Sequence, residues 1–270
     1  MADAQQPNAP MNGRKIFFLN PSFSMRTHII AALRKLEYEV YTFTDYKKAK
    51  AYLTIYHDSI LYINTETQLD IQAWMNFVRA IKEDMAFNST LLGIFCDHMG
   101  PTEANLVASS KYIDAGIFHA EGAYAGMLHL LTQKLEQLSA KGRRQYVRAN
   151  CTNDPTAGFL WIQNGKMFKA KLIDISVASV AILVATHNVP FLNATAQTFC
   201  TLQLNNKQVQ TRAKLLIVKQ KTPNTSAAIF MLDENTPAAS LDLIRAYIFE
   251  TLDNEILQSV KGMALDRASY

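Results

Sequence analysis

The sequence is poor in cysteine, proline and glycine and has no long apolar run, and these scarcities exclude several classes of protein. Its 270 residues include 3 Cys, 8 Pro and 10 Gly. Cys96, Cys151 and Cys200 are odd in number and far apart, so they predict neither a disulfide framework nor a zinc site. No apolar run reaches the roughly 18–20 residues of a membrane helix. We therefore expect a cytoplasmic protein with no membrane span and no bound metal or cofactor.

The composition predicts two globular domains with different charge. The hydrophobic fraction is 49% and the charged fraction 19%, which is typical of folded chains, and 270 residues suit two cores. Residues 1–142 carry 13 Lys/Arg and 14 Asp/Glu, whereas residues 143–270 carry 14 and 9. The second half therefore favours an anionic partner. Its excess of positive charge is too small for a groove that binds duplex DNA, so we expect no DNA binding. Residues 1–13 are polar, lack the core of a signal peptide and are expected to be a disordered tail.

Residues 14–141 alternate short apolar segments with amphipathic helices. We predict an α/β doubly wound parallel five-stranded sheet, because buried strands separated by helices form parallel sheets. Ser24 is expected to cap the first helix. The predicted strands are Lys15–Asn20, Glu39–Thr44, Ser59–Asn64, Thr90–Cys96 and Ala115–His119.

Residues 151–270 have a different pattern, with alternating polar and apolar side chains and hairpin signals such as Asn164-Gly165. We predict a small six-stranded antiparallel β-barrel with a C-terminal helix at 239–257. The predicted strands cover 158–163, 167–175, 180–185, 197–204, 208–219 and 227–232.

Arginines precede the predicted barrel, and an acidic turn lies within it. Residues 142–150 form a linker with Arg143, Arg144 and Arg148, and the turn contains Asp174, Ser176 and Ser179. Taken separately, the arginines are typical of a solvated helix end and the Asp-x-Ser of a simple turn. Together they resemble the two motifs of PilZ domains, an arginine pair four residues apart and Asp/Asn-x-Ser-x-x-Gly. Ser179 stands where that family has glycine.

The resemblance implies a binding site for cyclic di-GMP made of these six residues. An arginine can bond a phosphate or the O6/N7 edge of guanine in two places. Asp174 can accept the guanine N1–H and N2–H, and Ser176 can add a hydroxyl contact. The family's glycine suggests a left-handed backbone at Ser179, which would cost roughly 1–2 kcal/mol for a residue with a side chain. The hydroxymethyl group of Ser179 would also crowd a bound base. We therefore expect weakened binding, and tighter binding after Ser179→Gly.

The first half resembles a response-regulator receiver domain in its order of strands and helices, over about 125 residues. That family needs an acidic pair after the first strand, an aspartate after the third and a lysine after the fifth. Here the first two positions hold Asn20-Pro21 and Asn64, and the last strand ends at His119-Ala120. Phosphoryl transfer is therefore excluded, and Asp97 is interpreted as a solvated loop residue. A docking or dimerisation surface is the remaining hypothesis.

The two resemblances imply a bacterial, non-enzymatic second-messenger receptor that acts in motility or biofilm control. No nucleophile–base pair or glycine-rich phosphate loop is evident. The ligand signal would be relayed by domain reorientation or by a protein partner on the receiver-like domain. One alternative is an adaptor whose degenerate barrel no longer binds the nucleotide, and another is a single-strand nucleic-acid binder. The expected divisions are 1–13, 14–141, 142–150 and 151–270.

Overall fold

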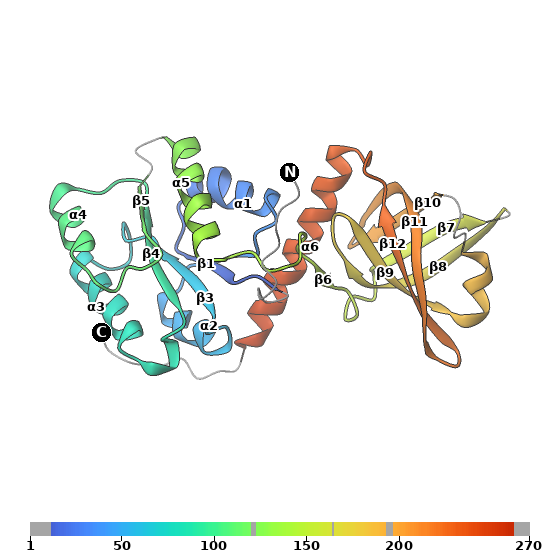
Figure 1. Ribbon diagram of the computed structural model, residues 1–270, viewed down its shortest axis with the longest axis horizontal. Helices are drawn as coiled ribbons and strands as arrows, with labels where there is room; N and C mark the ends of the chain where they lie inside the picture. The colour runs from blue at the N-terminus through green and yellow to red at the C-terminus, as the bar shows by residue number, and fades with distance from the viewer. Residues whose placement is uncertain (1–11, 120–122, 164, 193–196, 262–270) are drawn as a thin grey trace. The chain divides into compact units, whose positions relative to one another are not determined.

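The computed structural model describes residues 12–119, 123–163, 165–192 and 197–261 (Figure 1). The chain divides into two compact units, one made of residues 1–145 with 256–270 and the other of residues 146–255. The division between Gln145 and Tyr146 falls inside the expected linker, although the expected division placed 256–270 with the barrel. Most of the predicted tail, and Asn164 of the predicted hairpin turn, lie outside the described residues.

The first unit contains the predicted five-stranded parallel sheet, and the strand order is β2-β1-β3-β4-β5. This order places β1 between β2 and β3 and defines the doubly wound arrangement. The interiors of β1, β3 and β4 are apolar and buried, as expected for a sheet that helices cover on both faces. The strands are β1 (Lys15–Leu19), β2 (Val40–Phe43), β3 (Ser59–Ile63), β4 (Leu91–Cys96) and β5 (Ile117–His119).

Helices follow the strands as expected, with one difference at the first helix. That helix begins as η1 (Met25–Ile30) and continues as α1 (Ala31–Lys35). The prediction that Ser24 caps it is wrong, because Ser24 already has helical dihedral angles. The Met25 N–H instead donates to Ser22 Oγ at 3.1 Å. The other helical segments are η2 (Tyr46–Lys48), α2 (Ala49–Ile55), α3 (Ile71–Lys82), η3 (Met85–Phe87), α4 (Pro101–Ala108) and α5 (Tyr124–Gln137).

An aromatic cluster fills the core of the first unit and depends on one glycine. Phe18, Tyr62 and Phe95 are fully or almost fully buried. The Tyr62 ring lies 5.2 Å from that of Phe18 between centroids, and its hydroxyl donates to the Ala115 carbonyl at 3.3 Å. A Cβ atom on Gly93 would lie 2.5 Å from the Tyr62 ring. The absence of a side chain at residue 93 therefore makes room for Tyr62.

The second unit contains an antiparallel barrel, which confirms the predicted architecture. Its strands follow the order β6-β8-β7-β10-β11-β12-β9, and a further pairing of β8 with β9 closes the six main strands into a ring. Closure leaves no unpaired edge among those strands. The strands are β6 (Ala149–Asn150), β7 (Gly158–Gln163), β8 (Lys166–Ile175), β9 (Ser179–Ala185), β10 (Thr198–Leu204), β11 (Lys207–Thr222) and β12 (Thr225–Leu232).

Two helical segments accompany the barrel strands. The 3-10 segment η4 (Thr186–Phe191) follows β9, and the predicted C-terminal helix is α6 (Ala238–Ser259). Inside the barrel, the rings of Phe159 and Phe230 lie 4.9 Å apart between centroids. Inward and outward side chains alternate along the strands, so the outer wall can carry polar groups without disturbing this core.

We predict that Gly93→Ala destabilises the first unit, because the new methyl group would overlap the buried Tyr62 ring. Overpacking of this kind costs about 1–3 kcal/mol. Gly126→Ala is the control, since Gly126 lies within α5 and a Cβ there meets nothing within 4 Å. That change should be neutral or stabilising. Thermal unfolding of both variants checks this, and equal midpoints would contradict the packing argument.

Candidate ligand-binding site

The arginine-bearing linker begins where two backbone segments touch. A Cβ on Gly142 would lie 2.4 Å from the Asn12 carbonyl carbon, and one on Gly13 would lie 2.3 Å from the Ala140 oxygen. The Arg14 N–H also donates to the Ala140 oxygen at 2.9 Å. Only glycine permits an approach this close. The segment before β1 therefore fixes the start of the linker.

Arg143 and Arg144 follow this contact in irregular, exposed backbone. Arg144 Nη1 donates to Asn12 Oδ1 at 2.9 Å. Both arginines belong to the first unit, whereas Arg148 belongs to the second. Three of the predicted site residues thus lie along one short stretch of chain that crosses the division between the units.

A two-residue strand brings the last of these arginines to the predicted acidic turn. In β6, Ala149 pairs with Ile175 of β8 and Asn150 pairs with Asp174. This pairing holds the chain directly after Arg148 against the end of β8. Arg148 Nη1 then lies 3.4 Å from Asp174 Oδ1, and the two side chains are 40% and 32% exposed. The structure therefore unites two predicted site residues that are 26 positions apart.

An irregularity in β8 helps to orient Asp174. The pairing of β8 with β9 shifts register between Leu172 and Asp174, so that Asp174 lies opposite Ala181. Such a bulge re-aims the side chains that follow it. Leu172 and Ile175 are completely buried, while Asp174 keeps a partly exposed carboxylate next to the small side chain of Ala181. The Asp174 carboxylate therefore remains partly accessible to solvent.

Ser176 and Ser179 form a tight turn between β8 and β9. The Ser176 N–H donates to the Ser179 carbonyl at 2.8 Å, and the Ser179 N–H donates to Ser176 Oγ at 3.0 Å. The two hydroxyl oxygens are 3.1 Å apart. Ser176 is 1% exposed and Ser179 is 9% exposed. Both hydroxyls are thus engaged in shaping the turn.

The expectation of a left-handed backbone at Ser179 is wrong. Among the described residues, positive φ angles at non-glycine positions occur at Asn20, Glu37, Gln68, Ser139 and Asn205. The serine follows the same antiparallel ladder as its neighbours, because Ser179 pairs with Met231 of β12. The backbone strain that predicted tighter binding after Ser179→Gly is therefore absent.

The loop after β6 is fastened to α6 by a tyrosine, which the sequence did not predict. Tyr247 is 3% exposed, and its hydroxyl donates to Asp154 Oδ2 at 2.8 Å. Burial raises the pKa of Asp154, but hydrogen bonds from Thr156 and Tyr247 outweigh it, and the net pKa is lowered from 3.8. Asp154 is interpreted as a structural carboxylate that holds the loop between β6 and β7.

The receiver-like unit has hydrogen-bonded side chains at two positions that the sequence analysis compared with reactive groups. Asn64 is 3% exposed, and its Oδ1 accepts from the Glu66 N–H at 3.0 Å. Asp97 Oδ1 accepts from the Tyr124 hydroxyl at 2.9 Å, so the interpretation of Asp97 as merely solvated was incomplete. The amide of Asn64 acts as a cap for the following loop.

The described residues hold few groups suited to other chemistry. They contain no set of three or more His, Cys, Asp or Glu side chains that could hold a metal. The three cysteines are free and buried, and burial raises the pKa of Cys151 and Cys200 to about 12. No helix in the described ranges combines the length and apolar character needed to cross a bilayer.

Comparison with known proteins identifies solved structures for each unit. No family model matches the sequence, and no curated protein sequence matches it. The PilZ domain with c-di-GMP of YcgR from Escherichia coli has a TM-score of 0.39 at 16% identity, covering 44% of this chain and 98% of that chain. The Bacillus subtilis inhibitor of motility MotI has a TM-score of 0.35 at 15% identity, covering 42% of this chain and 53% of that one.

The chemotaxis response regulator CheY4 of Vibrio cholerae is also similar, with a TM-score of 0.36 at 18% identity over 46% of this chain and 99% of that chain. This chain spans about half the length of MotI and of the complete YcgR, at 53% and 52%. The two predicted resemblances, to a receiver and to a PilZ barrel, thus reappear among solved structures. At these identities and scores, the likenesses identify no binding residue.

We predict that Ser179→Gly destabilises the second unit. The change removes the hydroxyl that meets Ser176 Oγ, while the backbone bonds of the turn can persist. Loss of one such hydrogen bond costs about 1 kcal/mol. Denaturant unfolding measures the difference. A variant that is as stable as the parent would show that the hydroxyl pair contributes nothing.

Asp154→Asn should lower the free energy of unfolding at neutral pH by about 1 kcal/mol, because the amide accepts weaker hydrogen bonds than the carboxylate. A lowered pKa in the folded state means that ionised Asp154 stabilises the fold above pH 3.8. This contribution disappears as the pH falls through the folded pKa. Unfolding measured between neutral pH and about pH 3 should show the two proteins converging. A pH-independent difference would contradict this assignment.

Proposed function

We propose that the second unit is a receptor for cyclic di-GMP, bound at Arg148 and Asp174. The proposal is supported chiefly by the convergence of these two side chains through the β6–β8 pairing. A guanidinium can bind a phosphate or a guanine edge, and a carboxylate can accept the guanine N1–H and N2–H. Asp174 and Arg148 thus present complementary groups for one guanine-containing anion.

The resting ion pair favours exchange with a ligand. Arg148 and Asp174 are separated by 3.4 Å and are both partly exposed. Exposed pairs of this kind contribute about 0–1 kcal/mol, whereas a hydrogen bond to a charged group contributes about 1.5–3 kcal/mol. Opening the pair to admit the ligand therefore costs little compared with the hydrogen bonds that the ligand would form.

Arg143 and Arg144 complete the proposed site from the linker. Both are exposed in irregular backbone, and Arg144 would exchange its bond to Asn12 for the ligand. Ser176 and Ser179 would support the site by fixing the turn after Asp174. The linker would become ordered when the ligand binds, and the loss of chain entropy would lower the affinity. Binding would then be coupled to a change in the conformation of the linker.

The relay would use the receiver-like unit without phosphoryl transfer. Asn64 and Asn20 replace the acidic residues that such transfer needs. We propose that ligand binding at the linker changes the orientation of the two units or presents a surface of the first unit to a protein partner. The protein would then be a non-enzymatic, cytoplasmic regulator of motility or biofilm formation.

A second candidate function is that of an adaptor without nucleotide binding. The substitution of serine for the family's glycine at residue 179 is the observation that favours it. The ordinary backbone at Ser179 weakens this argument, because the turn forms without strain. Titration with the dinucleotide separates the two functions.

Arg148→Ala should weaken cyclic di-GMP binding at least tenfold, since it removes charge-assisted bonds worth about 1.5–3 kcal/mol. Arg212→Ala is the matched control. Arg212 is an exposed arginine on β11 whose guanidinium lies 4.4 Å from the Phe199 ring centroid. Calorimetric titration of the full chain measures both variants. Absence of binding by the parent protein, or equal affinity of the two variants, would refute the proposed site.

A further inference from the structure

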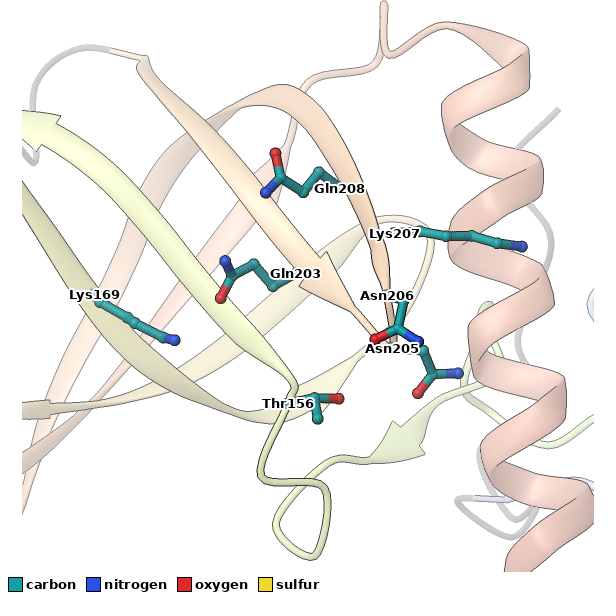
Figure 2. Close-up of a pocket in the computed structure, with 7 residues that line it drawn as sticks. All are labelled: Thr156, Lys169, Gln203, Asn205, Asn206, Lys207 and Gln208. Atoms are coloured by element: carbon teal, nitrogen blue, oxygen red, sulfur yellow. The ribbon is translucent and has the colours of Figure 1, made fainter.

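A hollow lies on the outer wall of the barrel, and none of its lining residues belongs to the proposed dinucleotide site. Its volume is 340 Å³, which is within the range of small-molecule sites. Figure 2 shows side chains from β8, β10 and β11 and from the loop before β7 around it. We call it the amide hollow, and its lining residues are Thr156, Lys169, Gln203, Asn205, Asn206, Lys207 and Gln208.

The strand register explains why these side chains share one face. Gln203 of β10 pairs with Gln208 of β11 on one side and with Gly158 of β7 on the other. Gly158 in turn pairs with Lys171 of β8. Side chains in one register row of a sheet point the same way, so the two glutamines stand together on the outer wall.

Gly158 keeps the hollow open. A Cβ at Gly158 would lie 3.1 Å from Gln203 Oε1 and 3.4 Å from Lys169 Cε. Its φ angle is outside the positive range that requires glycine elsewhere in the chain. The backbone would thus accept another residue, and the missing side chain chiefly creates space between Gln203 and Lys169.

The polar side chains around this space are placed differently from one another. Lys169 and Gln203 point towards one another, and Lys207 extends away from them (Figure 2). Asn205 is engaged, because its Nδ2 donates to Glu250 Oε2 at 3.1 Å. Each remaining amide side chain offers one acceptor oxygen and two N–H donors. Gln203, Asn206 and Gln208 together provide a dense set of such groups beside one ammonium.

The residue types restrict the class of ligand. The lining contains no carboxylate, which argues against a cation. It contains no aromatic side chain on which a base could stack, and no apolar side chain for an acyl chain. Paired donors and acceptors suit neighbouring hydroxyl groups, and Lys169 suits one negative charge. A hydroxyl-rich anion of monosaccharide size meets all of these conditions.

We propose that the amide hollow binds an anionic sugar, with the amides of Gln203, Asn206 and Gln208 on its hydroxyls and Lys169 on its carboxylate or phosphate. The site is independent of the proposed dinucleotide site, which uses Arg148 and Asp174. The barrel would then respond to a second small ligand or attach to an acidic polysaccharide.

The test is a titration of the isotope-labelled full chain, observed through the side-chain amide signals of Gln203, Asn206 and Gln208. Glucuronate and glucose 6-phosphate are the probes, and they distinguish a carboxylate from a phosphate. Both should shift these signals, with a dissociation constant on the order of 1 mM. Glucose, which lacks the charge, and acetate, which lacks the hydroxyls, should each bind at least tenfold more weakly.

Variants assign the effect to the hollow. Gln208→Ala should weaken binding about fivefold, as expected for one hydrogen bond, and Gly158→Val should abolish it by filling the space. Gln210→Ala is the matched control, because Gln210 is exposed on the same strand but pairs with Thr201 outside the hollow. Cyclic di-GMP titration of each variant should match the parent protein, so the two sites can fail separately.

Several results would overturn the proposal. Shifts of equal size with acetate would indicate a nonspecific charge effect. If neither glucuronate nor glucose 6-phosphate shifted these signals, the hollow would not bind anionic sugars. Shifts of the same amides with an oligothymidylate would indicate nucleic acid. Perturbation of these signals by cyclic di-GMP would assign the hollow to the dinucleotide site instead.

Discussion

The pairing of two residues, Ala149 and Asn150, with the end of β8 is the constraint on which the proposed receptor site depends. Arg148 precedes this pair directly, and Asp174 lies within the strand that the pair joins. Without the pairing, the linker arginine and the turn carboxylate would be separated by a long loop whose closure carries an entropic cost. The backbone hydrogen bonds of the fold offset this loss of entropy during folding, so ligand binding does not have to offset it. Such preorganisation favours affinity without adding contacts.

The same constraint continues into the loop that follows. The Cys151 N–H donates to the Ile173 carbonyl at 2.8 Å, and Asp154 receives the hydroxyl of Tyr247 from α6. A movement of β6 on ligand binding would therefore act on a loop that is held at Cys151 and at Asp154. Thr156, at the far end of this loop, lines the amide hollow. Within the second unit, hydrogen bonds therefore connect the loop after β6 both to β8 of the barrel wall and to α6.

The sequence predicted the features that depend on long periodic patterns. Five buried strands with intervening helices, and six alternating strands before a final helix, were recognisable because each segment carries its own hydrophobic period. β6 was not predicted, since two residues have no period. The contact of the Tyr247 hydroxyl was not predicted, because its partner Asp154 is 93 positions away. The dihedral angles of Ser179 were inferred from a family glycine, and they depend instead on the antiparallel ladder with β12.

The two units differ in how their polar side chains are engaged. Asn64 and Asp97 are committed to hydrogen bonds that hold their own loops, with Glu66 and Tyr124 as partners. A carboxylate bound by a tyrosine hydroxyl contributes to stability, and a buried amide cannot accept a phosphoryl group as an aspartate does. In the first unit, Asn64 and Asp97 therefore serve the structure of their own loops. In the proposed receptor, the exposed arginines and Asp174 provide the charged, rearrangeable groups that a switch requires.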